Sequence, residues 1–243
     1  DSRETLTALL PQVEPAQHRD WLHMIKGWQE TTRQVDIASQ EVDELIPPFV
    51  MRQLWYETKG NCTVVTDVGQ HQMWEAQYYH HETPRSLITS GGLGTMGFAL
   101  PAAIGAKVAR PDAEVWVVVG DGGFQMTMAE LATIAQEGID INVAIINNGY
   151  LGMVRQWQEF FYGNRYAESY VDALPDFVKL AEAYGHVGMK IEKPGDVEGA
   201  LREAFKLKER LVFMDFITDQ TENVFPMVPG GKGLTEMILA EEL

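Results

Sequence analysis

Residues 114–156 read EVWVVVGDGGFQMTMAELATIAQEGIDINVAIINNGYLGMVRQ and contain two short apolar runs, Val115 to Val119 and Ile141 to Ile146. Both runs are rich in β-branched residues, which favours β-strands. Between them, Thr127 to Gln136 has helical spacing and contains no helix breaker. A strand, a helix and a strand at this spacing predict a βαβ unit, in which the two strands run parallel.

Short polar, glycine-containing sequences follow both strands of this unit: GDGG at Gly120 to Gly123, and NNG at Asn147 to Gly149. Each of them alone is an ordinary turn, but the carboxyl ends of parallel strands meet where open α/β sheets bind ligands. Asp121 and Asn148 offer the hard oxygen ligands that Mg²⁺ prefers. Glycines let backbone N–H groups approach a phosphate, so the sequence predicts a site for a metal-bridged diphosphate.

The composition argues against several classes of partner. The chain has 243 residues and a formal net charge of −16, from 19 basic and 35 acidic residues. Nucleic acids and anionic membranes favour basic surfaces, so we expect neither as a partner. The single cysteine, Cys62, allows no disulfide framework within the chain. No apolar run approaches the roughly 18 residues that a membrane span needs.

Along residues 39–243, apolar runs alternate with helical patterns. This alternation predicts a doubly wound α/β fold, with a parallel sheet of about six strands flanked by helices. The predicted strands span residues 62–66, 86–89, 115–119, 141–146, 186–191 and 211–217. Residues 1–38 are more polar and helical, and their pattern from Glu14 to Thr32 includes one apolar face that needs a cover. That face consists of Trp21, Leu22, Ile25 and Trp28.

A second glycine-rich motif supports a competing interpretation. The stretch from Gly92 to Gly97 (GLGTMG) matches the G-x-G-x-x-G fingerprint of dinucleotide-binding folds, follows a predicted strand and opens a helix. Asp121 lies 24 residues beyond Gly97 and would be the ribose-binding acid of such a site. This interpretation gives no role to Asn147 or Asn148, and it places Pro101 within the helix. A Rossmann-type nucleotide-binding module remains an alternative.

Several motifs together resemble acetohydroxyacid synthase, also called acetolactate synthase, in its large-subunit form. They are VGQHQMW (68–74), SGGLGTMGFALPAAIG (90–105), GDGGFQM (120–126), NNGYLGMVRQWQE (147–159) and PMVPGG (226–231). The resemblance covers nearly the whole chain and implies a carboxyl-terminal portion of that enzyme. Residues 1–38 would be the end of a preceding domain and its linker, and residues 39–243 the thiamine-diphosphate-binding domain with its tail.

The resemblance also implies a role for each motif. Asp121 and Asn148 would bind Mg²⁺ through their side chains, and Tyr150 through its backbone carbonyl. Gln70 and His71 would contact the diphosphate of the cofactor, although His71 also fits an ordinary polar cluster. Further cofactor contacts would come from Gly94, Thr95, Met96, Gly120, Gly122, Gly123, Leu151, Gly152 and Met153.

Other residues would act around the cofactor. Met96 would bend thiamine diphosphate into its V shape, and a methionine is also a common packing residue. Trp157, with Met153, would lie at the substrate channel, although a core position is equally ordinary for a tryptophan. Gly91 and Gly92 would touch FAD, which this family holds mainly on its middle domain. The segment of residues 151–170 would exclude water from the reaction.

The family condenses pyruvate with a second pyruvate or with 2-ketobutyrate, losing CO₂, in branched-chain amino-acid biosynthesis. Its activating glutamate lies on a separate pyrimidine-binding domain, usually of a neighbouring subunit, so we expect no catalytic acid here and little turnover by this chain alone. The resemblance also implies a homodimer or larger assembly and a small regulatory subunit. It implies a bacterial cytoplasmic location, or an organelle if a transit peptide was removed. Another thiamine-diphosphate-dependent decarboxylase, carboligase or oxidase is an alternative.

Overall fold

The computed structural model describes residues 1–34, 36, 38, 43–207 and 210–240. The chain divides into two units, Asp1–Gln40 and Glu41–Leu243. The first unit contains α1 (Ser2–Leu9), a 3-10 turn η1 (Leu10–Gln12) and α2 (Arg19–Gln34). Its assignment to the end of a preceding domain stays a prediction.

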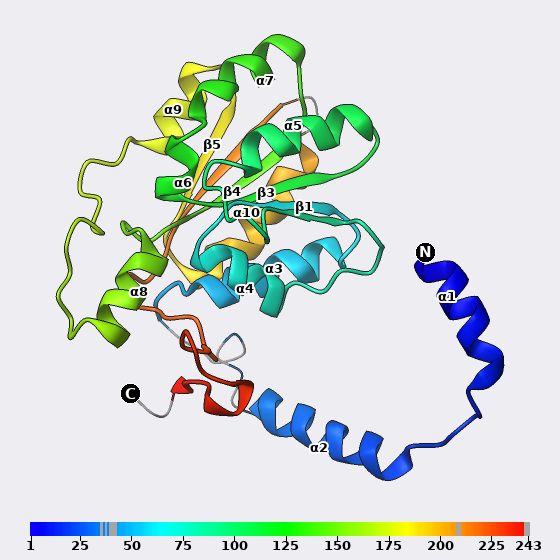
Figure 1. Ribbon diagram of the computed structural model, residues 1–243. Coiled ribbons are helices and arrows are strands. Elements are labelled where there is room, and N and C mark those ends of the chain that lie inside the picture. Colours follow the sequence, from blue (N-terminus) through cyan, green and yellow to red (C-terminus); the bar gives the residue numbers. More distant parts are fainter. Residues whose placement is uncertain (35, 37, 39–42, 208–209, 241–243) are drawn as a thin grey trace. The chain divides into compact units, whose positions relative to one another are not determined.

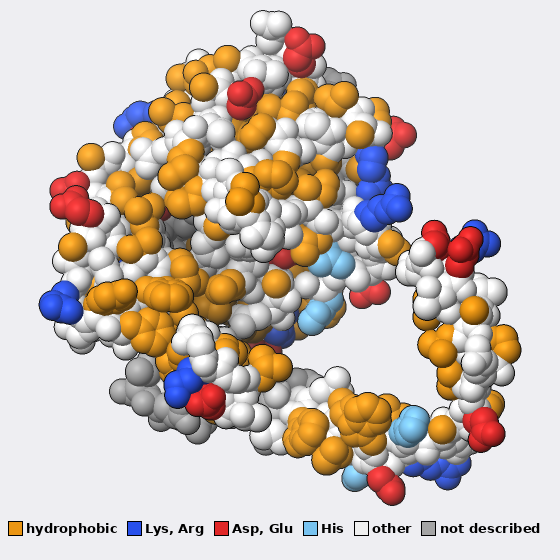
Figure 2. Space-filling view, viewed as in Figure 1, with side chains coloured by type: hydrophobic (Ala, Val, Ile, Leu, Met, Phe, Trp, Pro, Cys, Tyr) orange, Lys and Arg blue, Asp and Glu red, His pale blue; other side chains and the backbone are white. Residues whose placement is uncertain are grey.

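The predicted helix of the first unit is wrong at its start. We expected the pattern to begin at Glu14, but α2 begins at Arg19. Pro15 lacks a backbone N–H and disfavours helical geometry in the residue before it, so the helix starts beyond it. The apolar face of α2 is exposed, and hydrophobic side chains are visible along this unit in Figure 2. The large exposed side chains of α2 are Trp21, Leu22, Met24 and Trp28.

The second unit is built on a sheet of six parallel strands, as the sequence predicted (Figure 1). The spatial order of the strands is β2-β1-β3-β4-β6-β5, and each neighbouring pair is parallel. The bounds are β1 Thr63–Thr66, β2 Leu87–Thr89, β3 Val115–Gly120, β4 Asn142–Asn147, β5 Val187–Ile191 and β6 Val212–Ile217.

Helices cover both faces of the sheet, which confirms the doubly wound fold. Helices α3, α4 and α10 pack on one face, and α5, α7 and α9 on the other (Figure 1). The bounds are α3 Pro47–Thr58, α4 Gln70–Tyr78, α5 Ala99–Ala109, α6 Asp121–Gln125, η3 Met128–Glu130, α7 Leu131–Glu137, α8 Gly152–Phe161, α9 Phe177–Ala183, α10 Pro194–Lys206 and η4 Leu234–Glu236.

The central strand β3 is apolar at successive positions, without alternation between apolar and polar residues, because both of its faces are buried. Val115, Val117 and Val119 pack into the core on one face of the sheet. Trp116 and Val118 pack into the core on the other face. A strand covered on both sides buries every side chain, and each large apolar one contributes about 1.5–3 kcal/mol. A charged residue at any of these positions would therefore disrupt one of the two cores.

The chain reverses its direction of travel across the sheet between β1 and β3. From β1 it passes through α4 to β2 on one side, whereas from β3 it passes through α6 and α7 to β4 on the other. Where the connections that follow two neighbouring strands lead to opposite sides of the sheet, a crevice opens at the carboxyl ends of these strands. Ligands of open α/β sheets bind in that crevice. The topology therefore directs attention to the ends of β1 and β3.

The predicted helix between β3 and β4 is wrong at its start. We expected it to run from Thr127 to Gln136, but α6 already begins at Asp121 and the chain leaves helical geometry at Thr127, where φ is −133°. The Thr127 hydroxyl donates to the carbonyl of Gly97 at 3.0 Å. A side chain at Gly97 would come within 3.1 Å of Thr127. This close contact with a distant turn breaks the helix in two.

Candidate active site

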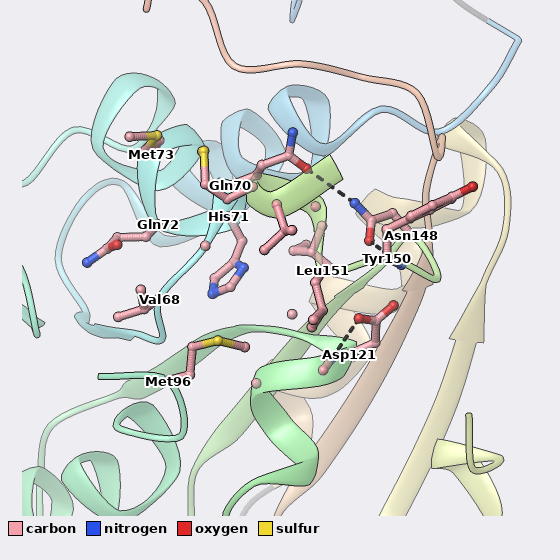
Figure 3. Close-up of a pocket in the computed structure, with 18 of the residues that line it drawn as sticks. Val68, Gln70, His71, Gln72, Met73, Met96, Asp121, Asn148, Tyr150 and Leu151 are labelled. Carbon is pink, nitrogen blue, oxygen red and sulfur yellow. Dashed lines mark hydrogen bonds between the residues drawn. The ribbon is translucent and has the colours of Figure 1, made fainter. Parts of the chain in front are cut away.

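A cavity of about 270 Å³ lies at the carboxyl ends of β1, β3 and β4 (Figure 3). Its walls come from three chain segments, residues 68–74, 120–123 and 148–154, together with Ile146 and Met96. The structure thus brings together motifs that are far apart in the sequence. The predicted residues that line it are Gln70, His71, Met96, Gly120, Asp121, Gly122, Gly123, Asn148, Tyr150, Leu151, Gly152 and Met153.

Asp121 is buried at the end of β3, where backbone N–H groups hold its carboxylate. Oδ2 accepts from the N–H of Gly149 at 2.7 Å, and Oδ1 accepts from the N–H of Gly122 at 2.6 Å. Burial raises the pKa of Asp121 to about 6, although these two hydrogen bonds oppose the shift. At neutral pH the site therefore contains a desolvated negative charge, which a bound cation would stabilise.

Asn148 is the second predicted metal ligand, and it is buried opposite Gln70. Its Oδ1 accepts from the N–H of Tyr150 at 3.1 Å, and its Nδ2 donates to Gln70 Oε1 at 3.4 Å (Figure 3). No group of three His, Cys, Asp or Glu side chains that could hold a metal occurs among the described residues. A cation here would therefore use mixed oxygen ligands, completed by phosphate or water oxygens, as Mg²⁺ commonly does.

His71 presents a buried ring nitrogen to the cavity. Its imidazole is only 6% exposed, and its Nε2 has no hydrogen-bond partner. Burial lowers the pKa of His71 to about 4, against the opposing charge of Asp67, so the ring is neutral at pH 7. An unpaired buried polar atom costs about 1–3 kcal/mol. Because the other ring nitrogen donates to the backbone of Asp67, Nε2 of the neutral ring is an acceptor, which an N–H or O–H group of a ligand would satisfy. His71 and Met96 point toward the same space in Figure 3.

Gly152 is required by a close approach at the start of α8. A Cβ atom there would overlap Oε1 of Gln70 and would lie 2.9 Å from Nδ2 of Asn148. Any larger residue would displace both amides. The last glycine of the NNGYLG motif therefore lets the side chains of Gln70 and Asn148 meet beside the cavity.

Asp67 is a site residue that our sequence reasoning missed. Its buried carboxylate follows β1 directly and accepts from the N–H groups of Gly97, at 3.0 Å, and Ala99, at 2.9 Å. These bonds fix the turn that carries Met96 into the cavity. Its place at the carboxyl end of a strand was the available signal, since such positions supply ligand sites in α/β folds.

The same contact weighs against the Rossmann alternative. A dinucleotide phosphate would bind the N–H groups where the glycine-rich turn enters its helix. Here the carboxylate of Asp67 already accepts from those of Gly97 and Ala99. A phosphate at this place would meet a negative charge and would have to displace it.

Arg155 and Gln156 on α8 were also missed, because nothing in the helical pattern marks them as buried. Arg155 donates to the carbonyl of Thr221 at 2.8 Å and to Oδ1 of Asn223 at 2.7 Å. It also pairs with Glu159 at 2.6 Å. These contacts hold the segment after β6 against α8.

Some predicted residues do not line the cavity. Trp157 is 42% exposed on α8 and packs edge-on against Phe161, with ring centroids 5.2 Å apart. Phe161 and Tyr162 are exposed as well, and Figure 2 shows an orange hydrophobic patch at the position of α8 in Figure 1. The roles predicted for the residues outside the lining stay predictions. Gly91, Gly92, Gly94 and Thr95 also lie outside the lining.

Comparison with known proteins agrees with this geometry. Residues 67–216 match the family model described as "Thiamine pyrophosphate enzyme, C-terminal TPP binding domain". The chain belongs to this family. The cavity of the thiamine pyrophosphate enzyme domain described above lies within the matched residues, as do both predicted metal-binding side chains, Asp121 and Asn148.

Similar curated proteins include acetolactate synthases from several bacteria, which confirms the resemblance read from the motifs. The chain is 47% identical over 225 residues to the acetolactate synthase isozyme 3 large subunit of Escherichia coli K12, covering 92% of this chain and 39% of that protein. It is 42% identical over 247 residues to the acetolactate synthase large subunit of Corynebacterium glutamicum, covering 98% and 39%. The chain thus spans about two fifths of the length of these relatives.

A solved structure shares the fold of this thiamine pyrophosphate enzyme domain. It is the Rhodococcus jostii RHA1 thiamine diphosphate-dependent 4-hydroxybenzoylformate decarboxylase, with a TM-score of 0.67 and 24% identity. The match covers 74% of this chain and 34% of that one. Among the described residues, no helix has the length and apolar character needed to cross a membrane.

Proposed function

We propose that this chain supplies the Mg²⁺-diphosphate half of the active site of an acetohydroxyacid synthase. The reaction joins two pyruvates, or pyruvate and 2-ketobutyrate, with loss of CO₂, and serves branched-chain amino-acid biosynthesis. The observation that carries the proposal is the convergence of Asp121 and Asn148 on one cavity at neighbouring strand ends. The similarity to proteins named acetolactate synthase large subunit supports the choice of reaction.

The residues of the cavity divide the work of holding the cofactor. Asp121 and Asn148 bind the cation through side-chain oxygens, and Tyr150 through its backbone carbonyl. His71 lies beside the diphosphate, and Met96 shapes the cofactor from the opposite wall. When bound, thiamine diphosphate supplies the carbon nucleophile that attacks the keto group of pyruvate. Helix α8 and the segment after it exclude water, which protects the reacting carbon from protonation.

Other components complete the enzyme. We place the activating glutamate on a pyrimidine-binding domain, contributed by a neighbouring subunit of a homodimer or larger assembly. FAD would lie mainly on the middle domain, with Gly91 and Gly92 near it, and a small regulatory subunit would bind elsewhere. The similar proteins described above are bacterial, and a cytoplasmic location stays a prediction.

Binding of the cofactor is the first test. Trp74 lines the cavity, so tryptophan fluorescence should report a titration with thiamine diphosphate in the presence and absence of Mg²⁺. We expect saturable binding that requires the metal, and a dissociation constant at least about 100-fold higher for Asp121→Ala, because a charged metal ligand is removed. Asp112→Ala is the matched control, since this exposed carboxylate precedes the same strand at its other end. Binding that ignores both Mg²⁺ and Asp121 would contradict the proposal.

Product analysis tests the reaction class separately. With its pyrimidine-binding domain present, the protein should convert pyruvate to acetolactate. Acetaldehyde would instead indicate a decarboxylase, and acetyl phosphate an oxidase, with the same cofactor site. Either result would leave the cofactor assignment intact and overturn the carboligase assignment.

A further inference from the structure

The carboxamide side chains of Gln156, Gln70 and Asn148 form a continuous chain of hydrogen bonds. This chain connects the segment after β6, called the tail here (residues 218–240), to the cavity. Gln156 Oε1 accepts from Gln70 Nε2 at 2.9 Å, and Gln70 Oε1 accepts from Asn148 Nδ2 at 3.4 Å. At its outer end, Gln156 is bound to the backbone of Val224, which belongs to the segment after β6. The chain ends at the predicted metal ligand.

The backbone of Val224 fixes the direction of this chain. Gln156 Oε1 accepts from the N–H of Val224 at 2.9 Å, and Gln156 Nε2 donates to its carbonyl at 3.0 Å. The amide of Gln156 is fully buried, so no water could replace a lost partner. If the amide turned over, its NH₂ group would face the N–H of Val224 and its oxygen would face the carbonyl of Val224. Only one orientation satisfies both backbone groups, and it presents an oxygen to Gln70.

The orientation passes from residue to residue. Because Gln70 meets an oxygen at Gln156, its NH₂ group faces α8. The same NH₂ group also donates to the carbonyl of Glu222, in the segment after β6, at 3.1 Å. The oxygen of Gln70 is then left for Asn148, whose NH₂ group must turn toward it. This leaves Oδ1 of Asn148 on the side of Tyr150, away from Gln70 (Figure 3).

We propose that Gln156 is a positioning residue that, together with the N–H of Tyr150, determines which atom of Asn148 is offered to the cation. The inference rests on the proposed function, in which Asn148 binds Mg²⁺. A reversed Gln70 would present its NH₂ group to Asn148, and Asn148 would turn over to offer its own oxygen there, at the expense of the hydrogen bond that Oδ1 accepts from the N–H of Tyr150. The NH₂ group of Asn148 would then face the cation, and a hard cation is not bound by an amide N–H.

Gln156 also holds the tail, so its two contributions must be separated. Loss of its amide frees Val224, two residues beyond Glu222, and thereby loosens the other acceptor of the Gln70 amide. A purely structural role would weaken the site whatever residue stands at 148. An orienting role matters only while residue 148 has two different terminal atoms. In an Asn148→Asp background both terminal atoms are oxygens, so the orientation no longer matters.

The test measures Mn²⁺ binding to the full-length polypeptide at saturating thiamine diphosphate, by electron paramagnetic resonance of the free ion. We expect Gln156→Met to raise the dissociation constant for Mn²⁺ about tenfold when Asn148 is present. In the Asn148→Asp background the same substitution should change it less than about twofold. Gln77→Met is the matched control, because Gln77 also donates from its amide to the tail, at the Phe225 carbonyl at 2.9 Å, without touching the amide chain.

The outcomes distinguish this inference from the proposed function. Equal Mn²⁺ affinity for the parent protein and Gln156→Met would overturn the inference and leave the proposed function standing. An equal loss in both backgrounds would also overturn it, since Gln156 would then act only by supporting the fold. Failure of the parent protein to bind Mn²⁺ with thiamine diphosphate would overturn the proposed function, and the inference with it.

Discussion

The buried imidazole of His71 makes stability depend on pH. Its pKa in the folded chain is about 4, because burial disfavours the charged form, whereas an unfolded histidine titrates near 6.5. Between these values the unfolded chain binds more protons, so stability rises with pH through this window and is lost as pH falls below about 6.5. We expect this group alone to lower the free energy of unfolding by about 2 kcal/mol at pH 5 relative to pH 8.

Urea denaturation at a series of pH values would measure this effect. His71→Gln is the comparison, because glutamine keeps a polar side chain and does not titrate. The difference between the two proteins should grow as pH falls from 7 to 5, while other titrating groups cancel. Parallel pH profiles would show that the imidazole is charged, or solvated, in the folded chain.

At the residue scale, the sequence predicted the side chains that line the cavity better than those that support them. Asp121 and Asn148 were found because a parallel strand has a known ligand-binding end. Asp67 also follows a strand, but its partners, Gly97 and Ala99, lie 30 and 32 residues away, and no local pattern connects them. Gln156 resembles any polar residue of an amphipathic helix until its contact with Val224 is known.

At the scale of single elements, the start of α8 is the most sensitive to size. Gly152→Ala should raise the dissociation constant for thiamine diphosphate about tenfold or more, because the added methyl group overlaps Gln70 and approaches Asn148. Isothermal titration calorimetry in the presence of Mg²⁺ would measure the change. Gly105→Ala is the control, since Gly105 lies within α5 and a Cβ there meets nothing within 4 Å.

The control substitution should leave binding unchanged and add roughly 0.5–1 kcal/mol of stability, since alanine favours a helix interior over glycine. If Gly152→Ala bound the cofactor as tightly as the parent protein, Gln70 and Asn148 would have to rearrange without cost. That result would contradict the close approach described at the start of α8.

Element boundaries show where local sequence stops being sufficient. All six predicted strands are present. The inner strands β3, β4 and β6 are mostly apolar runs buried on both faces of the parallel sheet, whereas the edge strands β2 and β5 are only partly buried. The helix predicted from Thr127 was wrong because the break depends on Gly97, on a different turn. The spacing of apolar residues within a segment indicates which side chains can share a face. It does not indicate which groups of the segment will form hydrogen bonds with a distant turn.

At the scale of the whole molecule, the two units should differ in their contribution to folding. Both hydrophobic cores of the sheet are made of side chains from Leu45 to Val224, outside the first unit. Removing residues 1–40 should therefore leave the urea midpoint of the remaining chain unchanged within the uncertainty of the fit. Far-ultraviolet circular dichroism should lose helical signal, because α1 and α2 are removed. A non-cooperative transition would show that the first unit is needed for the sheet.

The amide chain also has a consequence for the order of events during protein synthesis. Gln70 and Glu222, which share a hydrogen bond, are 152 positions apart in the sequence. At about 5–20 residues per second, about 8–30 s pass between the synthesis of one and the other. Throughout that interval a nascent chain has β1, α4 and then Asp121 at the end of β3, but not the segment after β6 that binds the amide of Gln70. The proposed metal site is therefore completed only after Glu222 and Val224 have been added, and a chain released before them lacks the backbone groups that hold Gln70 and Gln156.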